Sequence, residues 1–172
     1  AASGLQAAIK NRPALFYDVD DARWITVGNF ADDLAQVAEV DWIIEAAPER
    51  LEIKQALFAK VETHRRSGTF VSSNTSGIPI RLLAEGRSDD FRRHFLGTHF
   101  FNPPRYMKLL ELIPGPDTLP VVMQRMATFA ERTLGKGIVF AKDTPNFIAN
   151  RIAAFGLFTA MRLMIEGDYS IE

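Results

Sequence analysis

Short apolar runs alternate along the chain with longer stretches in which apolar residues recur every three or four positions. The runs have the length and composition of strands, and they are Val40–Glu45, Thr69–Ser73, Phe95–Phe101, Tyr106–Ile113 and Gly137–Lys142. The periodic stretches predict helices at Glu49–Thr63, Pro79–Ala84 and Leu119–Leu134. Strands that alternate with helices are typical of an α/β fold with a largely parallel sheet.

A few further elements are predicted outside this alternation of strands and helices. An alanine-rich stretch predicts a helix over Ala1–Lys10, and Trp24–Val27 has the composition of a short strand. Gly135 follows the last of the periodic stretches, in the position that a left-handed C-cap prefers.

The runs Phe95–Phe101 and Tyr106–Ile113 are too close in sequence to be parallel neighbours, because a parallel crossover needs a dozen or more residues. They are therefore expected to pair antiparallel. If the hairpin centre lies near Arg105, His99 and Glu111 are equidistant from it and face each other. The sequence thus predicts an imidazole within hydrogen-bonding reach of a carboxylate.

A histidine beside a carboxylate is the base and orienting half of many active sites, although a lone histidine in a strand is more often a satisfied core residue. Glu111 favours the functional interpretation, because apolar residues flank it and glutamate is almost never buried without a partner. The other two histidines, His64 and His94, lie beside arginines, where a solvated face explains them.

A helix start is predicted after the last strand, with Thr144 as N-cap and Pro145 in the first helical position. This helix runs to about Glu166 and is apolar nearly all round, so it needs another layer to cover it. We therefore expect a sheet domain over residues 1–144 and the beginning of a helical domain over residues 145–172.

Composition excludes several classes of function. The 172 residues, of which 47% are hydrophobic, are enough for one sizeable core. Twenty basic and 21 acidic residues give a net charge of -1, which provides no electrostatic basis for binding nucleic acid or an anionic membrane. The chain has no cysteine and its three histidines are not at ligand spacing, so we expect neither disulfides nor a metal site.

The apolar stretch Phe147–Ile165 resembles a membrane span only in length. Polar residues interrupt it, namely Asn150, Arg151, Thr159 and Arg162, which favours a buried or interface helix. The first residues lack the pattern of a signal peptide, and we expect a cytoplasmic location.

Ligands of doubly wound sheets bind beyond the carboxyl ends of the strands, and three predicted ends have suggestive residues. The segment Glu45–Glu49 combines small residues with an acid and is followed by Lys54, although acids are also common at helix N-termini. The segment Ser72–Gly77 is rich in hydroxyl groups, of which N-capping explains one. His99 lies at the third end.

Two kinds of chemistry use a histidine in this setting. A hydrolase would need Ser76 as its nucleophile, but the G-x-S-x-G elbow is missing. Hydride transfer from a secondary alcohol to a nicotinamide needs only an imidazole base, His99, and a carboxylate that stabilises the imidazolium. The residues therefore favour a dehydrogenase.

Several separate motifs resemble those of the L-3-hydroxyacyl-CoA dehydrogenases. They are Ser73–Ser76, His99–Pro103, Lys108 with Glu111, and Lys142–Arg151. The run Gly97–Tyr106 looks most like the long bacterial fatty-acid β-oxidation proteins, which join this dehydrogenase to an enoyl-CoA hydratase. The resemblance extends from about Gly28 to the end, and it implies NAD as the cofactor and an acyl-CoA as the substrate.

The resemblance also assigns roles to individual residues. His99 would be the catalytic base, Glu111 its orienting partner, and Ser76 and Asn150 would hydrogen-bond the substrate near the reacting carbon. The residues on the nicotinamide and ribose side of the cofactor would be Ala46, Glu49, Lys54 and Asn102. The complete protein would be a homodimer or a multidomain β-oxidation assembly.

The chain departs from the family pattern at both ends. It contains no G-x-G-x-x-G turn, since Gly135 and Gly137 follow a helix and precede a strand. Only Phe147–Glu172 corresponds to the helical domain. We therefore expect an incomplete Rossmann-type domain followed by the first helix of an α-helical domain, taken from the middle of a longer protein and poorly able to hold its cofactor alone.

Two alternatives to the dehydrogenase of 3-hydroxyacyl-CoA stay open at this point. The missing glycine-rich turn is compatible with a non-catalytic binding or structural relative of the fold. The same histidine chemistry also suits a dehydrogenase of another hydroxy acid.

Overall fold

A computed structural model describes residues 2–169 and shows one five-stranded sheet in the order β1-β2-β3-β4-β5. The strands are β1 (Trp42–Glu45), β2 (Phe70–Ser73), β3 (Phe95–Phe100), β4 (Leu109–Pro114) and β5 (Gly137–Phe140). The first three strands are parallel, β4 pairs antiparallel with β3, and β5 is parallel to β4. The predicted α/β class with a parallel-dominated sheet is confirmed.

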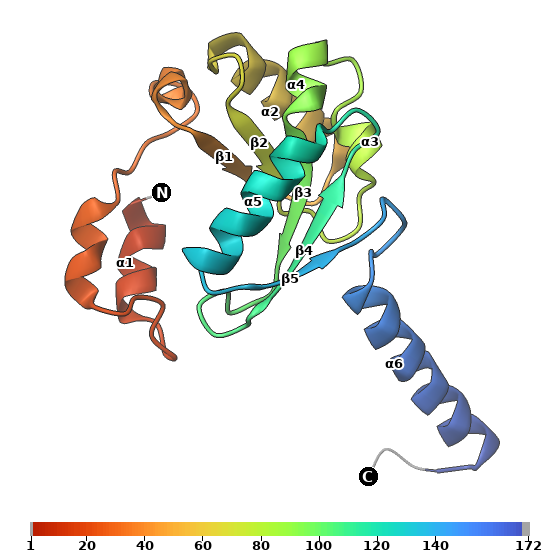
Figure 1. Cartoon of the computed structure of the whole chain (residues 1–172). Helices are drawn as coiled ribbons and strands as arrows, with labels where there is room; N and C mark the ends of the chain where they lie inside the picture. The colour runs from red at the N-terminus through yellow and green to blue at the C-terminus, as the bar shows by residue number, and fades with distance from the viewer. Residues whose placement is uncertain (1, 170–172) are drawn as a thin grey trace.

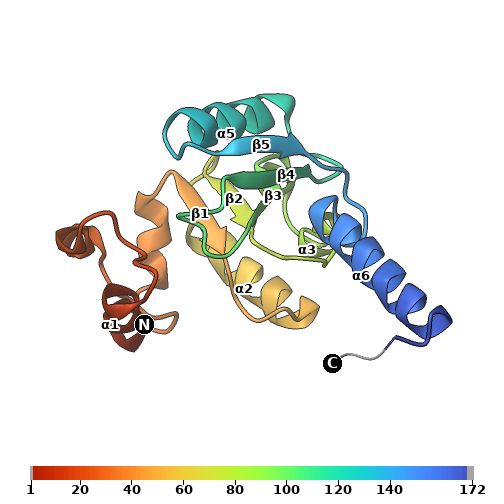
Figure 2. The same cartoon turned by 90° about the horizontal axis from the view of Figure 1, so that it is seen from below.

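Helices cover both faces of the sheet (Figures 1 and 2). The helices α2 (Leu51–His64) and α3 (Ile80–Leu83), which Figure 2 shows below the sheet, cover one face together with α4 (Asp89–Arg93). The other face is covered by α5 (Pro120–Arg132). These three layers form the incomplete Rossmann-type domain that the sequence predicts, and α6 (Ala149–Glu166) follows it.

Side chains of β3 and β4 alternate between two hydrophobic cores, as the period of two in a strand requires. Phe95 and Ile113 lie in the core under α2–α4, whereas Leu96 and Leu112 lie in the core under α5. His99 is four residues after Phe95 in the same strand, so both side chains lie on the same face of the sheet. The His99 side chain therefore faces the α2–α4 layer. The strand register places His99 opposite Glu111, as the hairpin argument predicts.

The helix α6 begins later than the sequence predicts. Thr144 is not its N-cap and Pro145 is not its first helical residue, because the first helical residue is Ala149. The intervening residues form a turn instead, in which the Phe147 N–H donates to the Thr144 carbonyl at 3.0 Å. Asn146 and Phe147 have positive φ angles of 62° and 50°, which a helix does not allow.

The expected strand over Trp24–Val27 is also wrong. Residues Val19–Trp24 form a 3-10 helix, η1, and the residues after it have no regular structure. A strand needs a hydrogen-bonded neighbour, and within residues 2–169 the sheet ends at β1. The predicted amino-terminal helix is present as α1 (Ala2–Lys10), whereas Ala1 lies outside the described residues. A second 3-10 helix, η2 (Leu34–Glu39), precedes β1.

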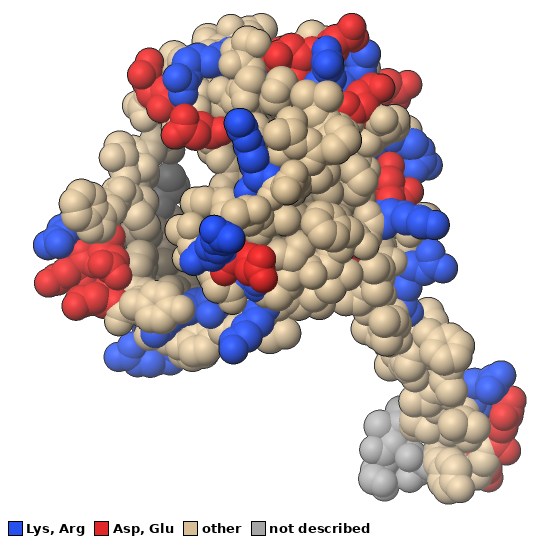
Figure 3. Space-filling model, viewed as in Figure 1, with Lys and Arg blue, Asp and Glu red and all other residues tan. Residues whose placement is uncertain are grey.

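The long helix α6 extends away from the rest of the molecule (Figures 1 and 2). Its exposed apolar side chains include Ile152, Phe155 and Ile165, and uncharged atoms dominate its surface in Figure 3. On the face drawn there, basic and acidic side chains are interspersed over the sheet domain. Among the described helices, none is long and apolar enough to cross a membrane.

At two positions the structure explains why the residue is glycine. Gly135 has a φ of +65°, which confirms the left-handed conformation expected after the helix α5. Gly97 lies in β3 under crowded side chains, because a Cβ there would be 2.7 Å from Ile80 Cδ1 and 3.0 Å from Ile113 Cδ1. A glycine at position 97 therefore lets α3 pack directly on the sheet.

Replacement of Gly97 by alanine should destabilise the fold by about 1–3 kcal/mol, because the added methyl group overpacks a filled core. Urea unfolding measures this change. Gly156→Ala is the matched control, since nothing lies within 4 Å of its Cβ position in α6, and it should raise stability slightly. A Gly97→Ala protein as stable as the wild type would contradict the packing described here.

Candidate active site

The residues selected from the sequence gather at one edge of the sheet, where β1, β2 and β3 end. Ala46 and Glu49 follow β1, Ser76 follows β2, and His99 lies one residue before the end of β3. Asn102 follows β3 in an exposed loop. The carboxyl ends of neighbouring parallel strands meet at one edge, so local sequence order determines this grouping.

His99 and Glu111 form a buried pair. His99 Nδ1 lies 2.7 Å from Glu111 Oε2, and the two residues are 3% and 0% exposed. The rings of Phe101 and Phe147 flank the imidazole, with centroids at 4.5 Å and 5.6 Å. Because a carboxylate accepts hydrogen bonds, Nδ1 is the donor, and Nε2 then has the lone pair that a general base needs.

The second carboxylate oxygen of Glu111 is bound to the start of α6. Glu111 Oε1 accepts hydrogen bonds from the backbone N–H groups of Ile148 at 3.0 Å and Ala149 at 2.8 Å. These N–H groups have no partner inside the helix, and the positive end of the helix dipole lies beside the carboxylate. Glu111 therefore connects His99 to α6, which nothing in the local sequence indicates.

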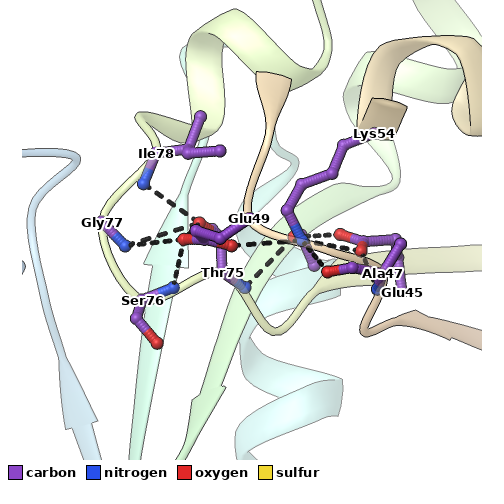
Figure 4. A network of polar contacts seen from close by, with 9 residues as sticks. Glu45, Ala47, Glu49, Lys54, Thr75, Ser76, Gly77 and Ile78 are labelled. Atoms are coloured by element: carbon purple, nitrogen blue, oxygen red, sulfur yellow. Dashed lines mark hydrogen bonds and ion pairs between the residues drawn. The ribbon is translucent and has the colours of Figure 1, made fainter. Parts of the chain in front are cut away.

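Ser76 and Asn150 are also brought together. The Asn150 amide nitrogen, in the first turn of α6, donates to the Ser76 carbonyl at 3.2 Å. The side chain of Ser76 points away from the polar contacts that hold its backbone, as Figure 4 shows. Its hydroxyl group is available to a ligand.

The carboxylate of Glu49 holds the backbone of the Ser76 segment. Glu49 Oε1 accepts from Thr75 Oγ1 at 2.5 Å, from the Ser76 N–H at 2.9 Å and from the Gly77 N–H at 3.2 Å (Figure 4). Partial burial alone would raise the pKa of Glu49, but the hydrogen bonds from Thr75 and Ser76, together with the Lys54 ammonium, outweigh it and lower the pKa.

Lys54 is not at the surface of the site. Its side chain is 1% exposed, and its ammonium group contacts Glu45 and Glu49. The cofactor role predicted for Lys54 stays a prediction. The roles predicted for Ala46, Glu49 and Asn102 toward the cofactor also stay predictions.

Other polar side chains that join these segments were not selected from the sequence. Asn74 Oδ1 accepts from the Phe100 N–H at 2.9 Å and thereby connects the end of β2 to that of β3. Asp143 accepts from the backbone N–H groups of Ile80 and Arg81 at the start of α3, at 2.7 Å and 3.0 Å. Asn and Asp are common in loops, so neither has a distinctive sequence signal.

Comparison with known families identifies the domain. The family described as "3-hydroxyacyl-CoA dehydrogenase, NAD binding domain" matches residues 4–144. The chain belongs to this family. The match also begins well before Gly28, where the resemblance read from the sequence motifs starts.

Individual relatives agree with this assignment. A probable 3-hydroxyacyl-CoA dehydrogenase of Bacillus subtilis is 52% identical over 97% of this chain, and a putative fatty acid oxidation complex trifunctional enzyme of Rickettsia felis is 41% identical over 91%. The crystal structure of 3-hydroxybutyryl-CoA dehydrogenase from Escherichia coli superimposes with a TM-score of 0.78 and 31% identity over 95% of the chain. The chain spans only 21%, 22% and 34% of these three proteins.

Replacement of Glu111 by glutamine should loosen the start of α6. One acceptor oxygen becomes an NH₂ donor, so the amide cannot accept from both His99 and the helix, and a buried group loses its partner. We expect a loss of about 1–3 kcal/mol in urea unfolding, with faster hydrogen exchange at Ile148 and Ala149. Glu85→Gln, at an exposed position, should change neither. Unchanged exchange at both α6 amides would contradict the proposed connection.

The lowered pKa of Glu49 predicts a pH-dependent contribution to stability. A carboxyl whose pKa is lower in the folded protein stabilises the fold above its unfolded pKa, near 4.5, and this stabilisation is lost as the pH falls through the folded pKa. Glu49→Gln should therefore lower the urea midpoint at pH 7, and its difference from the wild type should shrink below about pH 4.5.

The control for this experiment is Glu52→Gln in the first turn of α2, three residues after Glu49, where the carboxylate is exposed and 4.0 Å from Arg50. Its difference from the wild type should be small at every pH. A Glu49→Gln difference that is equal at pH 7 and pH 3 would contradict the prediction.

Proposed function

We propose that the complete protein containing this chain oxidises L-3-hydroxyacyl-CoA to 3-oxoacyl-CoA with NAD, as a step of fatty-acid β-oxidation. The observation that supports this most directly is the buried His99–Glu111 pair in a member of the NAD-binding-domain family. The adjacent Ser76 and Asn150 provide polar groups for a substrate next to that pair.

In this proposal His99 is the general base. Nε2 takes the proton of the 3-hydroxyl group, and the imidazolium that results is stabilised by the Glu111 carboxylate 2.7 Å from Nδ1. Because both residues are buried, the attraction between them is stronger than it would be in water. NAD bound at the ends of the strands would supply the hydride acceptor. The Ser76 hydroxyl and the Asn150 amide orient the substrate oxygen.

The residues at the strand ends fit the nicotinamide and ribose half of NAD. Ala46 is small and exposed beside the end of β1, the Glu49 carboxylate is partly exposed, and Asn102 is exposed in the loop after β3. This donor and acceptor set suits ribose hydroxyl groups and a carboxamide. The glycine-rich turn that binds a pyrophosphate does not occur in the 172 residues, so we assign no residue to that group.

Domain organisation and partners are part of the proposal. We place the domain boundary near Thr144, where the family match ends, and assign residues 145–172 to a helical domain that binds substrate or forms a homodimer. The trifunctional relative supports a multidomain assembly. The cytoplasmic location expected from the sequence stays a prediction.

A second candidate is a dehydrogenase of another hydroxy acid, which the same His99 chemistry would serve. A third is a non-catalytic relative, for which the missing glycine-rich turn is the motivating observation. Turnover by the complete protein of free hydroxy acids but not of 3-hydroxyacyl-CoAs would favour the second candidate. Absence of both NAD binding and turnover would favour the third.

The decisive experiment compares the complete wild-type protein with His99→Gln. Loss of the base should reduce NADH formation from 3-hydroxyacyl-CoA by a factor of about 10²–10⁴, whereas the NAD dissociation constant from calorimetry should change little. His94→Gln is the matched control, because His94, just after α4, pairs with Asp90 of that helix and not with Glu111. Turnover by His99→Gln at the wild-type rate would refute the proposed mechanism.

A further inference from the structure

The loop between β3 and β4, residues 101–108, directly follows the strand that contains His99, and it includes Asn102. The Asn102 side chain is exposed, so its position depends on how the backbone of the loop is held. The strand β5 begins beside the end of this loop, because the Gly137 N–H donates to the Lys108 carbonyl at 2.8 Å. The start of β5 therefore lies at the same edge of the sheet as the candidate active site.

Lys136, just before β5, binds the loop with its side chain. The ammonium group donates to the backbone carbonyls of Pro104 and of Met107, the latter at 2.8 Å. Its Nζ atom also lies 5.7 Å from the centroid of the Phe100 ring, a distance at which an aromatic face attracts a cation. One cation thus connects the last residue of β3 with two separate points of the loop.

The backbone of Lys136 is fixed by elements outside the loop. Its N–H donates to the Ala130 carbonyl of α5 at 3.0 Å, and the next residue, Gly137, is bound to the residue before β4. Gly135, with its φ of +65°, turns the chain between α5 and β5. The Lys136 backbone therefore does not move with the loop, and the ammonium group can hold the loop in one place.

A second cation connects the loop to a different part of the chain. Arg105 Nη1 donates to the carbonyls of Ala14 at 2.8 Å and Phe16 at 2.6 Å. These residues lie between α1 and η1, outside the sheet. Lys136 instead connects the loop to the start of β5, and thus to the sheet in which His99 lies.

We propose that Lys136 is a positioning residue, which holds the loop so that the Asn102 side chain meets the nicotinamide half of NAD. The inference rests on the proposed function, since it assumes that Asn102 contacts the cofactor. Pro104 and Met107 are exposed, so water can replace the ammonium group at their carbonyls, and no buried group is left without a partner. Removal of the charge should therefore loosen the loop and change the stability of the fold little.

The test uses Lys136→Met in the complete protein, because methionine keeps an unbranched side chain and removes the charge. The amides of Tyr106 and Met107, which both donate to the Pro103 carbonyl at 3.0 Å, should exchange about three- to tenfold faster. The NAD dissociation constant from calorimetry should rise by a similar factor. Lys136→Arg, which keeps the charge, should recover part of both.

Two further readouts separate positioning from other roles of Lys136. At saturating NAD, kcat should change little, because Glu111 holds His99 independently of the loop, and the urea midpoint should also change little. Weaker NAD binding with unchanged exchange in the loop would overturn the proposal and favour direct contact with the cofactor. A lower urea midpoint with unchanged NAD binding would also overturn it, because Lys136 would then serve the fold alone.

A double-mutant cycle tests whether Lys136 acts through Asn102. Asn102→Ala should weaken NAD binding by itself, and the addition of Lys136→Met should weaken it little further, since the two residues belong to one chain of contacts. Independent effects, in which the two factors multiply in the double variant, would overturn the proposal.

The matched control is Lys60→Met, which makes the same substitution at an exposed position of α2. Loop exchange, the NAD dissociation constant and the urea midpoint should all equal those of the wild type. If the wild-type protein binds no NAD and oxidises no 3-hydroxyacyl-CoA, the proposed function fails, and exchange at Tyr106 and Met107 still decides whether Lys136 holds the loop.

Discussion

The arrangement of the site depends on one carboxylate, that of Glu111. It is completely buried and accepts hydrogen bonds from His99 on one oxygen and, on the other, from the backbone N–H groups of Ile148 and Ala149 at the start of α6. A buried carboxylate is tolerated only where such partners replace water. The orientation of the imidazole and the start of α6 are therefore consequences of the same requirement.

A second carboxylate performs a comparable task on the neighbouring strands. Glu49 accepts hydrogen bonds from the Ser76 and Gly77 N–H groups, just as Glu111 accepts them from those of Ile148 and Ala149. The two segments held by these carboxylates also contact each other, because the Asn150 amide donates to the Ser76 carbonyl. Segments that lie far apart in the sequence thus come together through a carboxylate on β4 and another in the segment between β1 and α2, and not through apolar packing alone.

The part of this arrangement that local rules determine could be predicted. The short connection between β3 and β4 requires an antiparallel hairpin, and symmetry about Arg105 is enough to place His99 opposite Glu111. The order of strands and helices likewise follows from hydrophobic periodicity. Each of these features depends on residues close together in the chain.

The features that the sequence did not predict depend on distant partners. Thr144 and Pro145 have the local pattern of a helix start, but the N–H groups that Glu111 binds belong to residues 148 and 149, so the helix begins there. Lys54 has the pattern of a surface lysine on a helix, and it is buried because Glu45 and Glu49 converge on it. Periodicity contains no information about such partners.

The same contacts determine how α6 can influence the chemistry. The helix lies largely outside the sheet domain, with apolar side chains such as Phe155 exposed, and polar contacts to Glu111 and Ser76 hold its first turn. Phe147, just before the helix, packs against the His99 ring. Any shift of α6 therefore moves the Asn150 amide, which we propose binds substrate, together with a neighbour of the proposed base His99, and it changes the hydrogen bonds of the Glu111 carboxylate beside that histidine.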